Sequence, residues 1–194
     1  MNKPIKIYKT CLLVGRFQPF HVGHLKMIRK ALCLAETVLV FIGSSQESRT
    51  ERNPFSYEER KEMISKCFRK NKNLIIKPLR DIKVGDNSIW GEFVLDEAFK
   101  VLGEYPSLYL SGQEKVRASW FYGLKQAKMM DEISVHKTDN ISASILREKL
   151  VKCFNEVEMI YSDNYSYCLE KIPKECHKDI PFYAKTLKTV KENS

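Results

Sequence analysis

The fold of this chain is decided by residues 15–24, which read GRFQPFHVGH. An apolar run of strand length, residues 9–15, leads into this stretch, and a segment of helical period begins near Gly23. In an open α/β sheet, ligands gather beyond the carboxyl ends of the strands, where the N-terminus of a helix attracts phosphate. The stretch therefore predicts an α/β fold whose first strand ends in a phosphate-binding turn.

Further apolar runs of strand length alternate with segments of helical period along the chain. These runs are residues 37–43, 74–79, 107–111 and 132–137. Helical spacing follows at 91–102 and 144–154. The alternation predicts a Rossmann-like doubly wound parallel sheet with helices on both faces.

One helix start can be read directly from the sequence. Ser56 and Glu59 have the spacing of a capping box, and Pro54 would stop any helix that continued from upstream. We expect the inward-facing side chains of this helix to be Met63, Ile64, Cys67 and Phe68.

The net positive charge of the chain comes entirely from its first 150 residues. The net charge of the 194 residues is +9, and residues 1–150 hold 26 Lys and Arg against 17 Asp and Glu, whereas residues 151–194 hold seven of each. Such a positive field suits polyanions, including nucleotides, nucleic acids and membrane surfaces, so it does not choose among them.

Six cysteines are scattered without a CxxC pair, which predicts free thiols in a reducing compartment. Cys168, Cys176 and His177 could be part of a metal site, but no fourth ligand of suitable spacing accompanies them. The apolar run 11–14 is too short for a signal peptide, and no stretch has the length of a membrane span. We expect a cytoplasmic protein without a metal site of its own.

The two histidines of the opening stretch suit chemistry at phosphorus. His21 and His24 can present two N–H donors to neighbouring phosphate oxygens, and displacement at phosphorus depends mainly on positioning and charge stabilisation. Gly15 and Gly23 would let the backbone approach phosphates closely, beside the cation of Arg16. A structural or zinc-binding role is the alternative, but no acidic or Cys partner lies nearby.

A second motif, ISASILR at residues 141–147, directly follows the last predicted strand and its loop. Ser142 or Ser144 can cap the helix, and Arg147 lies one turn further on the same side as Ser144. An Arg there can reach the β- and γ-phosphates of a nucleotide and stabilise departing pyrophosphate. This motif is significant because it occurs together with the stretch that contains His21 and His24.

Together these elements resemble the HxGH nucleotidyltransferase superfamily, and the longer matches resemble its archaeal-type nicotinamide-nucleotide adenylyltransferases. The resemblance covers residues 10–150. It rests on GRFQPFHVGH at 15–24, GSSQES at 43–48, RNPF at 52–55, Glu59-Arg60, Asp81-Ile82, the segment 87–90, Ser111-Gly112 and ISASILR at 141–147.

The resemblance implies transfer of AMP from ATP to nicotinamide mononucleotide (NMN), which forms NAD and pyrophosphate with Mg²⁺ held by the ATP phosphates. His21, His24 and Arg147 would be catalytic. The residues implied to bind ATP are Gly15, Arg16, Phe17, Gly23, Ser111, Gly112, Ser142 and Ser144. Those implied to bind NMN are Phe20, Gly43, Ser44, Arg52, Asn87 and Trp90.

The irregular pattern after residue 155 indicates the domain organisation, and the resemblance implies the partners. Residues 1–155 would form the nucleotidyltransferase domain, and residues 156–194, where Pro173 and Pro181 interrupt short helices, would be a helical extension of the same domain. The partners would be ATP, NMN and further copies of the chain in a homo-oligomer, with no nucleic acid and no membrane.

Trp90 suits its implied role for a reason independent of the resemblance. An indole can stack on a flat pyridinium ring, and the positive charge of the ring adds a cation–π attraction. The preceding polar loop, Lys83 to Ser88, predicts partial exposure, although this loop is longer than is usual among archaeal-type enzymes. Trp120 lacks such a context and is expected to be structural.

Other functions remain open. Nicotinate mononucleotide, phosphopantetheine, riboflavin phosphate and the alcohol phosphates of CTP-dependent enzymes are alternative acceptors. A fragment of an aminoacyl-tRNA synthetase would carry a Lys-rich second motif, which the sequence lacks. A non-catalytic nucleotide-sensing or nucleic-acid-binding module would fit the positive charge, but no zinc-finger or RRM pattern is present.

Overall fold

The computed structural model describes residues 6–83, 86–112, 118–135, 141–155 and 162–193. The chain divides into two compact units. The sheet unit consists of Met1–Gly15, Lys26–Gly43 and Asn71–Lys137, and the helical unit consists of Arg16–Leu25, Ser44–Lys70 and Thr138–Ser194. Each unit is therefore assembled from segments that are distant in sequence.

The sheet unit is built on five parallel strands in the order β3-β2-β1-β4-β5. The strands are β1 (Tyr8–Gly15), β2 (Ala35–Ile42), β3 (Leu74–Pro78), β4 (Leu108–Ser111) and β5 (Asp131–Ser134). The predicted parallel sheet is confirmed, and a strand lies at each predicted position, although residues 136 and 137 of the last prediction lie outside the described residues. Because the chain passes from β1 outward to β3 and returns to the other side of β1, the sheet has a switch point between β1 and β4.

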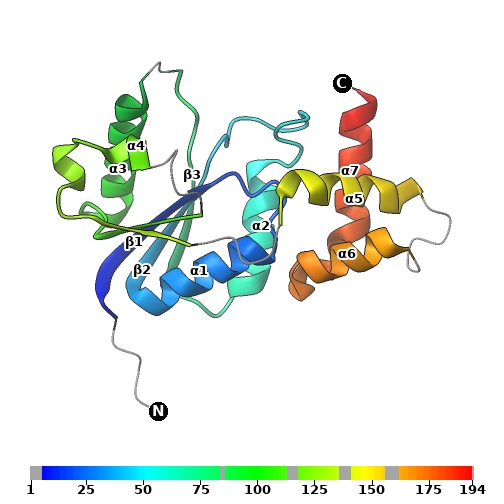
Figure 1. Ribbon diagram of the computed structural model, residues 1–194, viewed down its shortest axis with the longest axis horizontal. Coiled ribbons are helices and arrows are strands. Elements are labelled where there is room, and N and C mark those ends of the chain that lie inside the picture. The colour runs from blue at the N-terminus through cyan, green and yellow to red at the C-terminus, as the bar shows by residue number, and fades with distance from the viewer. Residues whose placement is uncertain (1–5, 84–85, 113–117, 136–140, 156–161, 194) are drawn as a thin grey trace, which may run out of the picture. The chain divides into compact units, whose positions relative to one another are not determined.

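Helices cover both faces of this sheet, as predicted. Figure 1 shows α3 (Asn87–Leu102) and α4 (Ala118–Phe121) on one side of the strands and α1 (Val22–Leu34) on the other. A short 3-10 turn, η1 (Lys125–Ala127), follows α4. One buried cluster joins α3 to alternate residues of the central strands, because side chains on a strand point to opposite faces in turn. Its members include Leu12, Val14, Leu39, Phe41, Val94, Leu95 and Ala98.

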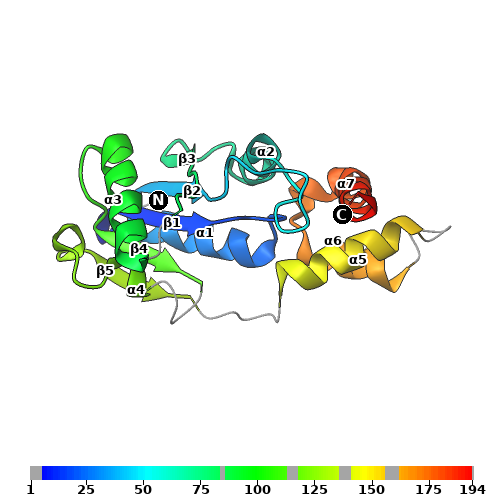
Figure 2. The same cartoon turned by 90° about the horizontal axis from the view of Figure 1, so that it is seen from above.

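The helical unit contains α2 (Tyr57–Phe68), α5 (Ala143–Asn155), α6 (Asp163–Lys171), the 3-10 helix η3 (Lys174–Asp179) and α7 (Ile180–Glu192). In Figure 2, α5 lies beside α6 and near α7, and residues of α5 contact residues of both helices. The segment η3 packs against α2 and α7. The buried side chains Leu146, Leu150, Ile180 and Leu187 form part of its apolar interior.

Helix α2 begins where its capping box predicts. The Ser56 Oγ atom accepts a hydrogen bond from the Glu59 N–H, and the Glu59 carboxylate accepts one from the Ser56 N–H. The inward-facing side chains differ from expectation at one position, because Cys67 is only partly buried. Arg60, which a hydrophobic pattern would place at the surface, is fully buried instead.

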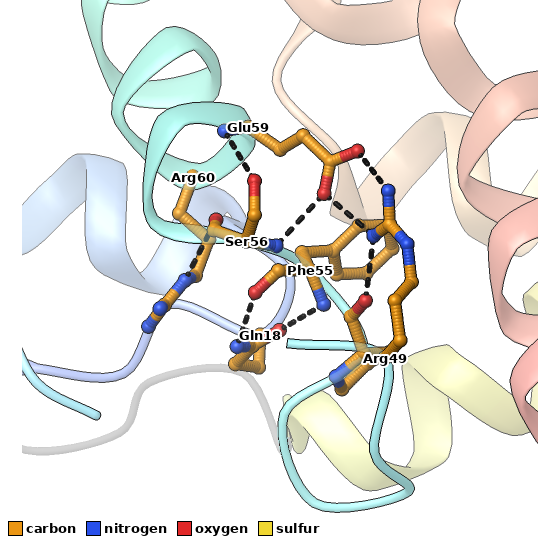
Figure 3. Close-up of polar contacts among 7 residues, drawn as sticks. Gln18, Arg49, Phe55, Ser56, Glu59 and Arg60 are labelled. Carbon is orange, nitrogen blue, oxygen red and sulfur yellow. Dashed lines mark hydrogen bonds and ion pairs between the residues drawn. The ribbon is translucent and has the colours of Figure 1, made fainter. Parts of the chain in front are cut away.

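The buried guanidinium of Arg60 binds three backbone carbonyl groups. Its Nε donates to the Ser56 oxygen at 3.1 Å, which Figure 3 shows, its Nη1 to the Arg16 oxygen at 2.9 Å and its Nη2 to the Ser44 oxygen at 3.1 Å. A buried charge is tolerated only when it is hydrogen-bonded, and the planar fork of Arg suits several acceptors at once. Arg60 therefore ties the residues that follow β1 and β2 to the start of α2.

Two of these tied segments contain strained backbone. Phe17, directly after Arg16, has a φ of 54°, and Ser44 has a φ of 48°. The left-handed region is unfavourable for residues with a side chain, by roughly 1–2 kcal/mol each. The hydrogen bonds from Arg60 hold the peptide groups at both positions and so help to offset this strain.

We predict that the substitution Arg60→Met lowers the free energy of unfolding by about 3 kcal/mol, because Met keeps the apolar volume but leaves buried carbonyl groups without a donor. Chemical denaturation of both proteins measures this difference. The control is Arg52→Met, which changes an exposed residue of the same unit and should shift stability by no more than about 0.5 kcal/mol. Equal losses in the two variants would contradict the structural role of Arg60.

Candidate active site

The two histidines of residues 15–24 lie at the first turn of α1. His21 immediately precedes the helix, and its Nδ1 accepts hydrogen bonds from the N–H groups of Gly23, at 3.2 Å, and His24, at 3.4 Å. This imidazole therefore caps α1. The rings of His21 and His24 are stacked, with centroids 3.7 Å apart and planes inclined by 20°.

The capping bonds decide which nitrogen of His21 carries the proton. Because Nδ1 accepts from backbone N–H groups, the neutral imidazole holds its proton on Nε2 and can donate from that atom. The backbone N–H groups of Gly23 and His24 already bind the His21 ring. The stacked imidazoles at the positive end of the helix dipole are thus the natural donors to an anion.

Gly23 allows this arrangement for a steric reason. A Cβ atom at residue 23 would lie 3.0 Å from the Cε1 atom of His21 and 3.1 Å from its Nδ1 atom. Most side chains would therefore push the imidazole away from the start of the helix. Phe17 and Phe20, both buried, pack against the His24 ring with centroid distances of 4.8 and 5.8 Å.

The second motif joins the first through Arg147. Ser142 caps α5 by accepting a hydrogen bond from the Ser144 N–H, which confirms the predicted cap. Arg147 donates to the Ser144 Oγ at 3.4 Å, on the predicted side of the helix, and to the backbone oxygen of Gln18 at 2.9 Å. The motif at residues 141–147 is thereby fixed to the stretch at 15–24.

The electrostatics at Arg147 favour an anion. Burial lowers the pKa of Arg147 and the positive charge of Arg16 lowers it further, whereas the smaller effects of Glu51 and Glu148 raise it. Arg16 itself is exposed. Two guanidinium groups that repel each other are both stabilised by an anion with several charges, so this cluster suits a phosphate chain.

Gln18 is a connecting residue that sequence reasoning did not identify. Its buried side chain accepts from the Phe55 N–H and donates to the Phe55 oxygen, both at 2.9 Å, as Figure 3 shows. The same residue receives Arg147 on its backbone oxygen. Gln18 thus links the histidine stretch to the RNPF segment at 52–55, and only its place within the motif could have indicated this role.

The remaining candidates in the helical unit are Ser44 and Arg52. Ser44 is buried, and its backbone oxygen binds Arg60. Arg52 is exposed and makes no hydrogen bond or ion pair with the part of the chain that the structure describes.

In the sheet unit, four candidates lie at or directly after the carboxyl ends of strands. Gly15 ends β1, and its oxygen accepts from the N–H of Gly43, which follows β2, at 2.9 Å. Ser111 ends β4 and is buried, with its Oγ 3.3 Å from the Oγ of Ser134. Gly112 follows directly. These residues gather at the edge of the sheet where ligands of doubly wound folds bind.

The other candidates in the sheet unit open α3. Asn87 is exposed at the first position of the helix, which Asp86 caps. Trp90 is half-buried and lies edge-on to Trp120, with centroids 5.9 Å apart. The helix comes so close to the Trp120 backbone at Gly91 that a Cβ there would lie 1.7 Å from the Trp120 oxygen. Partial exposure of Trp90 is confirmed.

The described residues contain no group of three or more His, Cys, Asp and Glu side chains that could hold a metal ion. Cys168, Cys176 and His177, which the sequence suggests as a partial site, form no such group among the described residues, and the Nε2 atom of His177 lies 2.9 Å from the Ile172 oxygen. All six cysteines are free thiols, as predicted. Among the described helices, none is long and apolar enough to cross a membrane.

Comparison with known proteins identifies relatives. A nicotinamide-nucleotide adenylyltransferase of Thermoplasma acidophilum is 40% identical over 84 residues, which cover 42% of this chain and 46% of that protein. A nicotinamide/nicotinic acid mononucleotide adenylyltransferase of Acinetobacter baylyi is 32% identical over 137 residues, which cover 71% of this chain and 72% of that protein.

Solved structures of NMN adenylyltransferases are similar to this chain in fold. A bifunctional NMN adenylyltransferase/ADP ribose pyrophosphatase from Francisella tularensis has a TM-score of 0.65 at 28% identity, over 75% of this chain and 42% of that chain. A second structure of that enzyme, complexed with AMP and a manganese ion, has a TM-score of 0.62 at 25% identity, over 84% of this chain and 52% of that chain. The predicted fold class is confirmed.

The match to the archaeal relative spans about half of that protein's length. The resemblance to nicotinamide-nucleotide adenylyltransferases, predicted from residues 10–150, is nevertheless confirmed by the archaeal relative of that name and by the Acinetobacter relative. A family model described as cytidylyltransferase-like matches residues 12–149. The chain belongs to the cytidylyltransferase-like family.

Proposed function

We propose that this chain transfers AMP from ATP to NMN, forming NAD and pyrophosphate in NAD biosynthesis. The observation that carries the proposal is the stacked pair of His21 and His24 at the start of α1, fixed through Gln18 to Arg147. Two imidazoles and a guanidinium form a set of donors suited to a phosphate chain. The names of the relatives support NMN as the acceptor.

In the proposed reaction an oxygen of the NMN phosphate attacks the α-phosphorus of ATP. A phosphorus–oxygen bond to the acceptor forms, the bond to the β-phosphate oxygen breaks, and pyrophosphate leaves with the electron pair. The attacking oxygen is already anionic, so no general base is required. His21 and His24 donate to the charge that develops at phosphorus, while Arg16 and Arg147 hold the departing phosphates.

The other proposed contacts follow the resemblance. Arg52 binds the phosphate of NMN, and Asn87 and Trp90 bind its nicotinamide. The remaining proposed contacts to ATP are Gly15, Phe17, Gly23, Ser111, Gly112, Ser142 and Ser144, and the remaining contacts to NMN are Phe20, Gly43 and Ser44.

A divalent cation accompanies this chemistry, and the manganese ion in the Francisella structure supports it. We assign Mg²⁺, held by the phosphates of ATP, where it would neutralise charge on the leaving pyrophosphate. We also propose that the protein is a cytoplasmic homo-oligomer in which residues 156–194 extend the nucleotidyltransferase domain.

Nicotinate mononucleotide is a second candidate acceptor, because the name of the Acinetobacter relative includes both nucleotides. Its ring carries a carboxylate where NMN carries a neutral amide. The two acceptors therefore differ by one charge at the ring that Trp90 is proposed to bind.

Purified protein with ATP and Mg²⁺ is expected to turn over NMN with a higher kcat/KM than nicotinate mononucleotide or phosphopantetheine. Chromatographic detection of the dinucleotide and pyrophosphate measures this preference. Faster turnover of phosphopantetheine would overturn the acceptor, and binding of ATP without turnover of any acceptor would indicate a nucleotide-sensing module.

Replacing a catalytic imidazole separates chemistry from binding. The substitution His24→Ala is expected to reduce kcat by about a hundredfold or more, because it removes a donor to the transition state, while ATP binding stays measurable. Steady-state kinetics and calorimetric titration with ATP provide the two readings. Turnover close to that of the unmodified protein would show that His24 has no catalytic role.

Trp90 provides a test of the acceptor side. The substitution Trp90→Phe keeps an aromatic ring beside Trp120, whereas Trp90→Ala removes it. We expect Trp90→Ala to raise the KM for NMN by about tenfold, with a much smaller change in the KM for ATP and an intermediate effect of Trp90→Phe. Equal changes in both KM values would instead indicate a purely structural Trp90.

A further inference from the structure

The exposed Arg52 lies at the tip of a tight turn, residues 49–54, that we name the Arg52 turn. The Arg49 N–H donates to the Pro54 oxygen and the Thr50 N–H to the Asn53 oxygen, both at 3.3 Å. The Asn53 N–H donates back to the Thr50 Oγ at 3.0 Å. These bonds close the turn at its base and leave residues 51 and 52 at its tip.

One side of the turn is fastened by an ion pair between Arg49 and Glu59. The Arg49 Nη1 and Nη2 atoms donate to the two carboxylate oxygens of Glu59 at 2.7 and 2.6 Å, as Figure 3 shows. Nη1 also donates to the Pro54 oxygen at 2.8 Å. Arg49 thus binds α2 through two hydrogen bonds to Glu59 and binds the opposite end of its own turn through Pro54.

Arg49 needs this support because its backbone is strained. Its φ of 59° lies in the left-handed region, which residues with a side chain rarely adopt. Burial alone would raise the pKa of Glu59, but hydrogen bonds from Arg49 and Ser56 bring it below its ordinary value. The carboxylate is therefore ionised and able to hold Arg49 at neutral pH.

The other side of the turn is fastened to the site. The amide of the fully buried Asn53 donates to the Glu47 carboxylate at 2.6 Å. Phe55 is paired with Gln18, which also receives Arg147. The Arg52 turn is thus held at one end by Glu59 and at the other by the residues that carry the phosphate chemistry.

We propose that Arg49 and Glu59 are positioning residues that determine affinity for the acceptor, because their ion pair holds the Arg52 turn in the shape that presents Arg52 to the acceptor phosphate. This inference rests on the proposed function, which assigns that phosphate to Arg52. Ordering a loop during binding weakens affinity, whereas a loop already held in place avoids that loss. Neither residue contacts substrate in this assignment.

The test compares Arg49→Ala, Arg49→Lys and Glu59→Gln with the unmodified protein. The Gln variant can still close the capping box with Ser56, so it removes mainly the charge that holds Arg49. We expect Arg49→Ala to raise the KM for NMN by about tenfold, with kcat and the KM for ATP changed by less than about twofold. Arg49→Lys and Glu59→Gln should give smaller increases, because a single hydrogen bond can persist.

The matched control is Glu58→Gln, on the same first turn of α2. Glu58 forms a loose ion pair with Lys61 at 3.9 Å, and its side chain is largely exposed. Its substitution should leave both KM values unchanged. If Glu58→Gln raised the KM for NMN as much as Glu59→Gln does, the loss of one negative charge would explain both increases. That result would overturn the positioning role.

A double substitution tests whether Arg49 acts through Arg52. If it does, Arg49→Ala should add nothing to the KM for NMN in a protein that already carries Arg52→Ala. Additive increases would overturn the inference. Hydrogen exchange gives a reading independent of activity, since the Thr50 and Asn53 amides should exchange faster in Arg49→Ala, and unchanged exchange would show that the ion pair does not hold the turn.

Failure of this inference differs from failure of the proposed function. Absence of NMN turnover in the unmodified protein would overturn the function and, with it, the link to an acceptor. Normal turnover with an unchanged KM for NMN in Arg49→Ala would overturn only the positioning role.

Discussion

The buried guanidinium of Arg60 is the constraint on which the rest of the helical unit depends. It donates to the backbone oxygens of Arg16, Ser44 and Ser56, so these three hydrogen bonds persist while three segments keep their positions. The segment after Arg16 leads to the paired histidines, and the segment after Ser44 leads to the Arg52 turn. One residue of α2 therefore holds the two chain segments that lead to the paired histidines and to the Arg52 turn.

Much of the fold could be predicted because its signals are local. The strands are apolar runs of the right length, and the capping box at Ser56 and Glu59 depends on residues three apart. The helical period places residue 60 on the same side as Met63 and Ile64, but a hydrophobic pattern assigns a charged residue to the surface and cannot anticipate a cation that is buried by backbone oxygens. The same pattern overestimated the burial of Cys67, which is only partly buried.

The candidate site was predictable only in part, for a related reason. The histidines at the start of α1 and the position of Arg147 beside Ser144 follow from spacing along one helix. The contacts that assemble the motifs join residues far apart: Gln18 to Phe55 across 37 positions and Arg147 to Gln18 across 129. No periodicity encodes such pairs. The capping of α1 by an imidazole was also hidden, because His is an unusual residue for that role.

The most direct measurement follows the phosphorus atoms of ATP. Purified protein is mixed with NMN, Mg²⁺ and ATP that is labelled at either the α- or the γ-phosphorus. If hydrogen-bond donors promote direct transfer of the adenylyl group, without a covalent intermediate, the α-label should appear in the dinucleotide and the γ-label in pyrophosphate. The protein itself should stay unlabelled. Transfer of the γ-label to NMN, release of it as inorganic phosphate, or an α-label retained on the protein would contradict this chemistry.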